Sequence, residues 1–321
     1  MTSTSVSRRL PNGQILWGEK PYRSLDYHLR QQFGEKIYKV SLNAGMTCPN
    51  RDGTLGTRGC LFCSEGGSGE FAGNRSLSIS EQIEMQKHGL LEKFPARHFI
   101  AYFQAYTNTY APVPYLRSVF TEALSHRDVV GLSVGTRPDC LPREVLDLLA
   151  ELNRVKPVSV ELGLQTIYGD TARLIRRGYE LDCFDKAVKA LRQRGLEIVV
   201  HTILGLPGED KGRILETMDY LNHSGIQGVK LQLLHVLRGT DLADYFENPG
   251  FSILTQEEYT DLVISCLEVL SPDITIHRLT GDGPRNLLIA PVWSQRKTAV
   301  LNLIHHEMKR RVTWQGRLWV P

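Results

Sequence analysis

Short hydrophobic runs rich in β-branched residues recur along the chain and predict parallel strands. They occupy residues 36–43, 98–106, 128–135, 157–165, 196–204 and 228–236. From the second run onward they begin 29 to 39 residues apart, which is the length of one strand–helix unit. The spacing therefore predicts an α/β fold in which strands alternate with helices.

The segments between these runs show the helical period. Three of them cover residues 141–153, 182–195 and 209–225. The first has an apolar face formed by Val145, Leu148, Leu149 and Leu152, with Pro142 in its first turn. For the second we expect Asp182 as the N-cap and Gly195 as the C-terminal stop, and for the third an end near Gly225. A further helix over 255–270 and an extra strand over 273–279 follow the sixth run.

Six βα units of this length predict a partial (βα)6 TIM-like barrel with right-handed crossovers. We expect the barrel to span residues 36–280, between an N-terminal extension (1–35) and a basic C-terminal extension (281–321). In barrels of this kind the chemistry lies on the loops that follow the carboxyl ends of the strands. The long loop after the first predicted strand is therefore the first place to look for a site.

Composition and charge narrow the class of protein. The chain of 321 residues is 41% hydrophobic and 23% charged, which is ordinary for a globular protein. No apolar run approaches the roughly 20 residues that span a bilayer, and the N-terminal segment lacks the apolar core of a secretory signal. We therefore expect a cytoplasmic protein with no membrane partner.

The net charge of +3 is unevenly distributed. Residues 285–321 carry seven Lys and Arg against the single acid Glu307, and residues 1–39 carry seven basic against three acidic residues. Basic ends on an acidic body suggest a polyanionic partner. A solvated amphipathic tail explains the same charge without any partner.

Three of the six cysteines lie on the loop after the first predicted strand. Cys48, Cys60 and Cys63 have the spacing C-x11-C-x2-C, which in a protein of this composition indicates metal-binding or catalytic thiols. A cubane iron–sulfur cluster with one open iron, a zinc with three protein ligands, and a redox or structural thiol group all remain open on spacing alone. Cys183 and Cys266 lie in helical patterns and are expected to be small core residues. Cys140 follows the third strand, where a substrate-facing role is open.

The order of further motifs resembles one known family. "CLFC" at 60–63 is followed by "GTRPD" (135–139), "VELGLQT" (160–166), "RRGY" (176–179), "HTILGLPGE" (201–209) and "LHVLRGT" (234–240). In this order the motifs resemble the radical S-adenosylmethionine (SAM) superfamily. Nearly the whole chain resembles its YhcC/YtqA-type subfamily, which is related to the branch of the elongator catalytic subunit.

The resemblance implies a 4Fe–4S cluster on Cys48, Cys60 and Cys63 that binds SAM and cleaves it reductively. Phe62 would shield the cluster. Arg177 would pair with the SAM carboxylate, because a planar guanidinium suits a bidentate contact, although Arg176 beside it could take that role.

The remaining SAM contacts are also implied by the resemblance. Gln165 would bind the ribose hydroxyls. Ile203, Gly205 and Leu206 would line the adenine. His235 would contribute backbone contacts from the sixth strand.

Two positions depart from the family's pattern. Relatives end the second strand in a Gly-Gly-Glu type stretch that receives the SAM amine, whereas this chain has Gln104, Ala105 and Tyr106, which offer backbone carbonyls. Where some relatives place an Asp for the ribose, this chain has His201.

The sequence leaves the substrate open among three classes. The first is a tRNA wobble uridine, with conversion of its carboxymethylaminomethyl group to aminomethyl as the activity that the subfamily implies. Some 40 residues after the barrel are too few for the acetyltransferase domain of the elongator subunit. The second class is a small metabolite, as in a coproporphyrinogen oxidase-like enzyme, and the third is a non-catalytic iron–sulfur carrier.

An RNA substrate would give the basic tail a role. Its cations are interleaved with tryptophans, which together offer phosphate contacts and stacking surfaces. The candidate RNA-binding residues are Arg296, Lys297, Lys309, Arg310 and Arg311. Alternatively, residues 298–311 form an amphipathic helix that packs its apolar side on the protein and exposes its charges to solvent without binding RNA. The family's chemistry also requires an electron donor such as flavodoxin or ferredoxin.

Overall fold

The computed structural model describes residues 7–67, 69–248, 251–281 and 283–321. Its α-helices are α1 (Leu25–Phe33), α2 (Ile79–Leu91), α3 (Val113–Ser125), α4 (Arg143–Asn153), α5 (Gly169–Leu174), α6 (Leu181–Arg192), α7 (Lys211–Ser224), α8 (Asp241–Glu247), α9 (Gln256–Val269) and α10 (Lys297–Arg310). Two 3-10 helices cover Pro138–Cys140 and Val292–Gln295. None of the helices described is long and apolar enough to cross a bilayer.

The strands are β1 (Arg8–Arg9), β2 (Ile15–Leu16), β3 (Tyr38–Leu42), β4 (Phe99–Phe103), β5 (Val129–Thr136), β6 (Val158–Gln165), β7 (Glu197–Leu204), β8 (Gly228–Leu233), β9 (Val236–Leu237), β10 (Thr275–Arg278) and β11 (Leu288–Ala290). One sheet has the hydrogen-bonded order β10–β8–β7–β6–β5–β4–β3. Its pairings β3–β4, β4–β5, β5–β6 and β8–β10 are parallel. The predicted α/β fold is thus confirmed, and the extra strand predicted over 273–279 joins the sheet as β10.

Many strand and helix ends differ from the expected ones by one or two residues, α6 ends at Arg192 rather than next to Gly195, and four further differences change an assignment. The second predicted strand ends at Phe103, so residues 104–106 lie beyond it. The sixth ends at Leu233, and Val236–Leu237 forms the separate strand β9, which pairs antiparallel with β11. The N-cap of α6 is Glu180, so Asp182 lies in the first turn, where a carboxylate still favours the helix dipole. Pro142 is the N-cap of α4, one residue before the helix.

The chain divides into two compact units. The cysteine-loop unit comprises Lys36–Gly163 and Arg176–Val199, and the terminal unit comprises Met1–Glu35, Leu164–Ile175 and Val200–Pro321. The boundaries predicted at 35/36 and 280/281 stay predictions.

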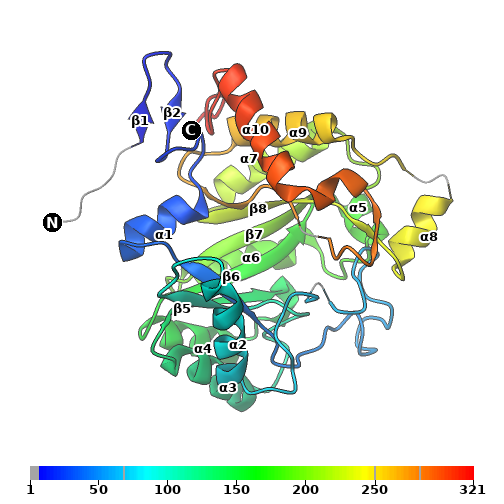
Figure 1. Cartoon of the computed structure of the whole chain (residues 1–321). Coiled ribbons are helices and arrows are strands. Elements are labelled where there is room, and N and C mark those ends of the chain that lie inside the picture. Colours follow the sequence, from blue (N-terminus) through cyan, green and yellow to red (C-terminus); the bar gives the residue numbers. More distant parts are fainter. Residues whose placement is uncertain (1–6, 68, 249–250, 282) are drawn as a thin grey trace. The chain divides into compact units, whose positions relative to one another are not determined.

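In the cysteine-loop unit, helices cover one face of β3, β4, β5 and β6. α2 packs on β3, α3 packs on β5, and α3 also contacts both α2 and α4 (Figure 1). α2 begins at a capping box, in which the Ser78 hydroxyl accepts from the Glu81 amide and the Glu81 carboxylate accepts from the Ser78 amide. The covered face is apolar because alternate strand residues point to it, as Val40 and Leu42 of β3 do.

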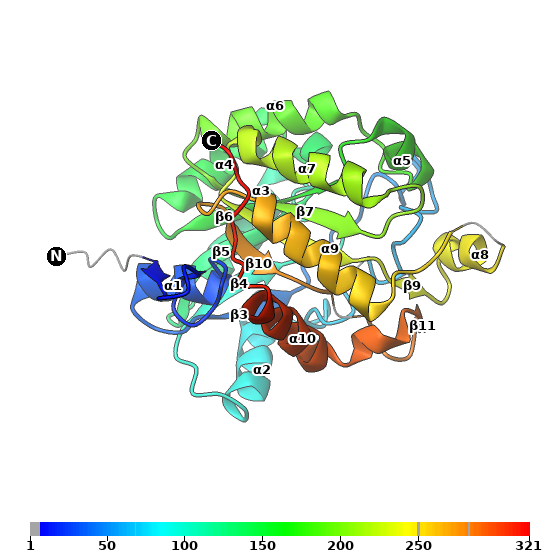
Figure 2. The ribbon, with the colours of Figure 1, turned by 90° about the horizontal axis from the view of Figure 1, so that it is seen from above.

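In the terminal unit, α9 lies between α7 and α10 and packs on both (Figure 2). The N-terminal segment and the C-terminal tail also meet here. The side-chain amide of Gln14 donates to the carbonyls of Thr313 and Met308 at 2.8 and 3.4 Å, and the backbone amide of Arg23 donates to the Gln315 side-chain oxygen at 2.9 Å. The two predicted extensions are therefore bound to each other through buried hydrogen bonds.

Candidate active site

The loop between β3 and α2 folds around the three clustered thiols, which are all half-buried. Its turns are closed by backbone bonds from the Arg51 amide to the Cys48 carbonyl (2.8 Å) and from the Cys63 amide to the Cys60 carbonyl (3.0 Å). The guanidinium of Arg51 donates to the carbonyls of Cys63 and Ser64 at 2.8 and 2.6 Å. At Gly59 the backbone has φ +76°, and a Cβ would lie 2.8 Å from Arg51 Nε. Arg51 therefore ties the two halves of the loop together, and only glycine allows this approach.

The pKa of the Cys60 thiol depends on its burial and on the charge of Arg137. Burial raises the pKa of the Cys60 thiol to about 12, Cys63 adds to this, and the Arg137 guanidinium opposes it. Burial alone would lower the pKa of Arg137, but the Asp139 carboxylate raises it above its ordinary value. Binding of a metal to these thiols therefore requires release of protons, and the thiolate charge would be formed next to a fixed cation.

Of the three alternatives that the spacing leaves open, two involve a metal, and these two differ in how close together the thiol sulfurs must lie. Among the described residues, the Glu84, His126 and Asp128 side chains place their ligand atoms all within 4.8 Å of one another, and the three thiols form no such group. Two sulfurs bound to one zinc are at most about 4.6 Å apart, since a Zn–S bond is about 2.3 Å. In a cubane each thiolate binds a different iron. The thiols as they stand therefore fit a cluster better than a single zinc.

The Glu84 group is an ion-pair network. Lys87 Nζ lies 2.8 Å from a Glu84 oxygen and 2.6 Å from an Asp128 oxygen, and His126 Nε2 lies 2.7 Å from Glu84. The lysine ammonium thus supplies the positive charge that these carboxylates face.

Asn50 connects the cysteine loop to the turn that follows α5. Its amide nitrogen lies 3.3 Å from Cys60 Sγ and 2.8 Å from the Arg176 carbonyl oxygen. Arg137 reaches the same turn, because its guanidinium donates to the Arg177 carbonyl at 2.9 Å. Neither Asn50 nor Arg137 was among the residues expected from the sequence, although Arg137 lies within the motif "GTRPD".

The Arg177 guanidinium is almost completely buried, with 2% of the residue exposed. It donates to the Tyr179 carbonyl from Nε (3.0 Å) and Nη2 (2.9 Å), and it lies 4.7 Å from the centre of the Tyr179 ring. The ring also faces Arg137, at 5.0 Å. The structure therefore places the predicted SAM-carboxylate residue on the same turn that Asn50 ties to Cys60.

The end of β4 also lies against the cysteine loop. The Tyr106 amide donates to the Gly67 carbonyl at 3.0 Å, and the Tyr106 hydroxyl donates to the Glu65 carbonyl. Tyr106 has φ +60°, so the chain turns sharply after the strand. Tyr106 is thus held against the thiol loop, and Ala105 lies there too, with its Cβ 2.6 Å from the position of a Cβ on Gly69. The role of residues 104–106 at the SAM amine stays a prediction.

The other predicted SAM residues belong to the terminal unit. His201 and Ile203 lie in β7, and Gly205 follows it with φ +89° and the Leu254 side chain 3.1 Å from the position of a Cβ. Leu206 is buried. Gln165, at the end of β6, has φ +66°, and its buried side-chain oxygen has no hydrogen-bond partner among the described residues.

His235 follows β8 and contacts two glycines. A Cβ on Gly281 or Gly283 would lie 2.8 or 3.1 Å from its ring. The imidazole is therefore packed against backbone. The predicted roles of these residues toward SAM stay predictions.

Phe62 is half-buried within the loop, and Cys140 is buried with its thiol 3.7 Å from Asp139. Burial, followed by the Asp139 carboxylate, raises the pKa of Cys140 to about 12. A thiol in this state is a poor nucleophile. Cys266 is buried, as expected for a core residue, whereas Cys183 is half-buried.

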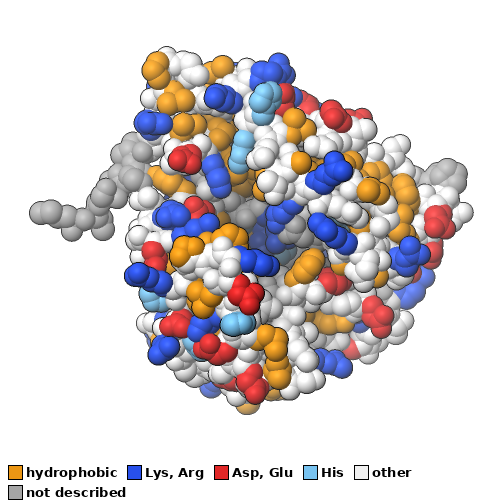
Figure 3. Space-filling model, viewed as in Figure 1, with side chains coloured by type: hydrophobic (Ala, Val, Ile, Leu, Met, Phe, Trp, Pro, Cys, Tyr) orange, Lys and Arg blue, Asp and Glu red, His pale blue; other side chains and the backbone are white. Residues whose placement is uncertain are grey.

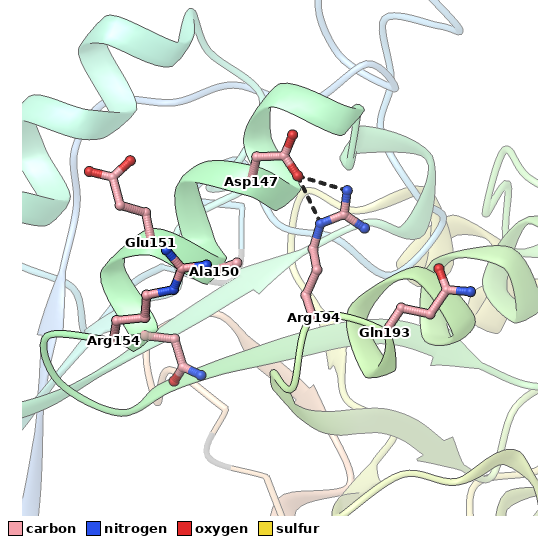
Figure 4. Close-up of a pocket in the computed structure, with 7 residues that line it drawn as sticks. Asp147, Ala150, Glu151, Arg154, Gln193 and Arg194 are labelled. Atoms are coloured by element: carbon pink, nitrogen blue, oxygen red, sulfur yellow. Dashed lines mark hydrogen bonds and ion pairs between the residues drawn. The ribbon is translucent and has the colours of Figure 1, made fainter.

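A surface pocket of about 700 Å³ lies apart from these residues, at the C-terminal ends of α4 and α6 (Figure 4). Arg194 donates to Asp147 across it, from Nε at 3.0 Å and Nη2 at 2.8 Å. Its lining residues are Asp147, Ala150, Glu151, Asn153, Arg154, Gln193 and Arg194, and they include none of the predicted site residues.

The Asn50 contact gives a testable prediction. Asn50→Ala removes an N–H donor to Cys60 sulfur, and donors to the ligand sulfurs raise the reduction potential of a cluster. We expect a lower midpoint potential, measured by redox titration followed by electron paramagnetic resonance.

Asn108→Ala is the matched control for this change. Asn108 is also a buried asparagine, and its amide donates to the Gly135 carbonyl. Its replacement should leave the potential unchanged. Equal potentials in Asn50→Ala and the wild type would show that the amide does not act on the cluster.

Two family models and several curated proteins match most of this chain. The model of the radical SAM superfamily matches residues 53–221, and that of the radical SAM C-terminal domain matches residues 226–310. The chain is 46% identical to YtqA of Bacillus subtilis and 37% identical to YhcC of Escherichia coli K12. The first alignment covers 94% of both chains, and the second covers 91% of this chain and 95% of YhcC.

A more distant relative is named for tRNA chemistry, and a solved structure of similar fold comes from the same organism. The tRNA uridine(34) acetyltransferase of Methanocaldococcus infernus is 26% identical over 59% of this chain, which spans 35% of that protein. The solved structure of Elp3 from the same organism superposes with a TM-score of 0.67 and 17% identity. It covers 87% of this chain, which in turn spans 64% of the Elp3 chain.

Proposed function

The chain belongs to the radical SAM superfamily, and we propose that it converts the carboxymethylaminomethyl group of a tRNA wobble uridine to aminomethyl. It is a radical SAM enzyme, and its cofactors are a 4Fe–4S cluster and SAM. The observation that supports the RNA substrate is the similarity to an archaeal tRNA uridine(34) acetyltransferase. The particular side-chain conversion is the one implied by the likeness to the YhcC/YtqA-type subfamily.

Each group of residues has a defined task in this proposal. When bound, the cluster and SAM supply a 5′-deoxyadenosyl radical that abstracts hydrogen from the substrate. Cys48, Cys60 and Cys63 hold the cluster, and Arg51 fixes the shape of their loop. Arg177 binds the SAM carboxylate from a turn that Asn50 keeps beside Cys60.

The proposed reaction is an oxidation followed by hydrolysis. Removing the carboxymethyl group as glyoxylate takes two electrons from its N–CH2 carbon and adds one water. Bound SAM would accept these two electrons together with one proton, and it would be released as 5′-deoxyadenosine and methionine. The products of the side chain are then the aminomethyl group and glyoxylate.

Mass spectrometry of tRNA nucleosides from cells with and without the gene tests this proposal. We expect carboxymethylaminomethyl nucleosides to accumulate in the cells that lack it. An unchanged nucleoside profile together with an accumulating small metabolite would instead favour the small-metabolite class.

The basic tail is a weaker RNA surface than its charge suggests. Figure 3 shows Lys and Arg side chains next to acidic ones in the region of α9 and α10. Arg310 pairs with Glu307 at 2.8 Å, and Arg311 pairs with Asp261 at 2.7 Å and with Glu307 at 3.2 Å. Such pairs are exposed and screened by salt. Arg310 and Arg311 can therefore release their carboxylate partners and bind phosphates of the RNA instead.

We expect the joint change of Lys309, Arg310 and Arg311 to alanine to weaken tRNA binding and to flatten its salt dependence. For each phosphate that the variant no longer neutralises, the slope of log K against log salt should become shallower by about 0.7 to 0.9. Gel-shift titrations at two salt concentrations measure both quantities. SAM cleavage in the absence of RNA should stay unchanged.

The matched control removes the same charge elsewhere. Arg97, Arg127 and Arg154 are exposed residues of the cysteine-loop unit. Their joint change to alanine should affect binding less than the tail variant. Equal losses in the two variants would show that only net charge matters, and the tail would then have no specific role.

A further inference from the structure

One uncharged polar side chain of α2 is buried on the face that the helix turns toward the core. Gln82 is 1% exposed, and Ile79 and Ile83 on the same face are buried as well. Burying an amide costs free energy unless its hydrogen bonds are satisfied. Since an apolar residue would avoid this cost, the contacts of Gln82 indicate its role.

The Gln82 side chain bonds to both ends of the cysteine loop, the segment between β3 and α2. Its oxygen accepts from the Asn43 backbone amide at 2.9 Å. Its nitrogen donates to the carbonyls of Asn43 and Leu77 at 2.9 and 3.1 Å. Asn43 is the first residue after β3, and Leu77 directly precedes the N-cap of α2. One side chain therefore closes the loop, and both of its N–H groups are used.

The returning part of the loop contacts both Gln82 and β3. The Gly73 amide donates to the Ser41 carbonyl at 2.8 Å. A Cβ on Gly73 would lie only 2.3 Å from the Gln82 side-chain oxygen, closer than non-bonded atoms approach each other. Glycine at this position therefore leaves the room that Gln82 needs to reach Asn43.

The first thiol follows closely on the Gln82 contact. Cys48 lies five residues after Asn43, and the carbonyl of Thr47, directly before it, accepts from the Thr107 amide at 3.2 Å. The backbone that leads to Cys48 is therefore held at two points, at Asn43 by Gln82 and at Thr47 by the segment after β4.

The cysteine loop depends on such contacts for its shape. None of its described residues lies in a helix or strand, and loops of this kind longer than about 15 residues are uncommon unless they are functional. Three thiolates that bind one cluster must keep fixed mutual positions, because each binds a different iron. Residues that orient metal ligands from behind therefore affect how firmly the metal is held.

We propose that Gln82 is a positioning residue for the cluster. It acts through the backbone from Asn43 to Cys48 and keeps the Cys48 sulfur in place relative to Cys60 and Cys63. The inference rests on these three cysteines being the cluster ligands, as in the proposed function, and it is independent of the substrate.

Gln82→Met tests this role, because methionine has a similar volume and makes none of the three hydrogen bonds. In the protein without cluster, the amides of residues 43–47 should exchange hydrogen faster than in the wild type. In the reconstituted protein, a chelator should remove iron roughly 5- to 150-fold faster, the effect of leaving one buried polar group unpaired. The electron paramagnetic resonance spectrum of the reduced cluster should also change.

Ile83→Val is the matched control for stability. Ile83 is the next residue on α2 and is fully buried, so the variant loses core packing without touching the bonds to Asn43. It should lower the melting temperature and leave the rate of iron loss and the spectrum unchanged.

Gly73→Ala reaches the same contact from the loop. Its Cβ would displace the Gln82 oxygen, so this variant should speed iron loss as Gln82→Met does. It provides the same test if Gln82→Met fails to fold.

The outcomes separate positioning from stability. Faster exchange at residues 43–47 with the iron loss and spectrum of the wild type would overturn the positioning role. Iron loss that follows the melting temperature equally in all three variants would also overturn it, because Gln82 would then act on stability alone. A wild type that binds no cluster after anaerobic reconstitution would instead refute the ligand assignment, and the inference with it.

Discussion

Replacing Cys48, Cys60 or Cys63 by alanine will abolish the cluster and all SAM cleavage. Each thiolate is expected to hold one iron, so removing any of them leaves a second iron without a protein ligand. After anaerobic reconstitution, the wild type should bind about four irons and four sulfides per chain, and the variants should bind far less. With a strong reductant, only the wild type should release 5′-deoxyadenosine.

Cys183→Ala is the matched control for these variants. Cys183 is also half-buried and lies on α6, outside the loop. Its replacement should leave the iron content and SAM cleavage unchanged. Stoichiometric zinc and no iron in the anaerobically prepared wild type would contradict the cluster assignment.

The second large effect is expected at Arg177. Arg177→Ala should weaken SAM binding roughly 10- to 150-fold, the loss of one charge-assisted contact of about 1.5–3 kcal/mol. The cluster should remain, because the Asn50 amide bonds to the backbone of this turn and to Cys60, and neither bond uses the Arg177 side chain. Calorimetry on the cluster-loaded protein measures the affinity, and the visible absorbance of the cluster checks its content.

Arg176→Ala is the comparison that locates the carboxylate partner. Arg176 is adjacent in sequence and half-buried, whereas Arg177 is almost completely buried. We expect it to bind SAM as the wild type does. The opposite pattern, with SAM affinity reduced in Arg176→Ala and kept in Arg177→Ala, would move the role to Arg176.

The strands and most helix ends could be predicted from patterns within a few neighbouring residues. Each of the six hydrophobic runs contains a strand, because alternation of side chains and β-branched residues act within a few positions. Gly225 ends α7 as predicted, since it adopts φ +77° at the C-cap. The N-cap of α6 was misplaced by two residues, because Glu180 and Asp182 both precede the same apolar face and no side-chain hydrogen bond fixes the cap.

Contacts between distant segments were not predicted. Gln14 bonds to Thr313 across nearly the whole chain, and no local pattern relates the two residues. The same holds for Asn50 and Arg176, and for Lys39 and Glu161. The alternation of polar and apolar residues along β3 and along β6 does place Lys39 and Glu161 on the face opposite the apolar one. Which charges meet there depends on the order and register of the strands.

The most direct test of the account is an anaerobic reaction of the reconstituted protein with SAM, a strong reductant and tRNA that carries carboxymethylaminomethyluridine. The account predicts that the nucleoside changes to aminomethyluridine, with one 5′-deoxyadenosine and one glyoxylate formed for each conversion. Formation of 5′-deoxyadenosine with an unchanged nucleoside would contradict the proposed substrate, and the absence of both products would contradict the enzyme's assigned chemistry.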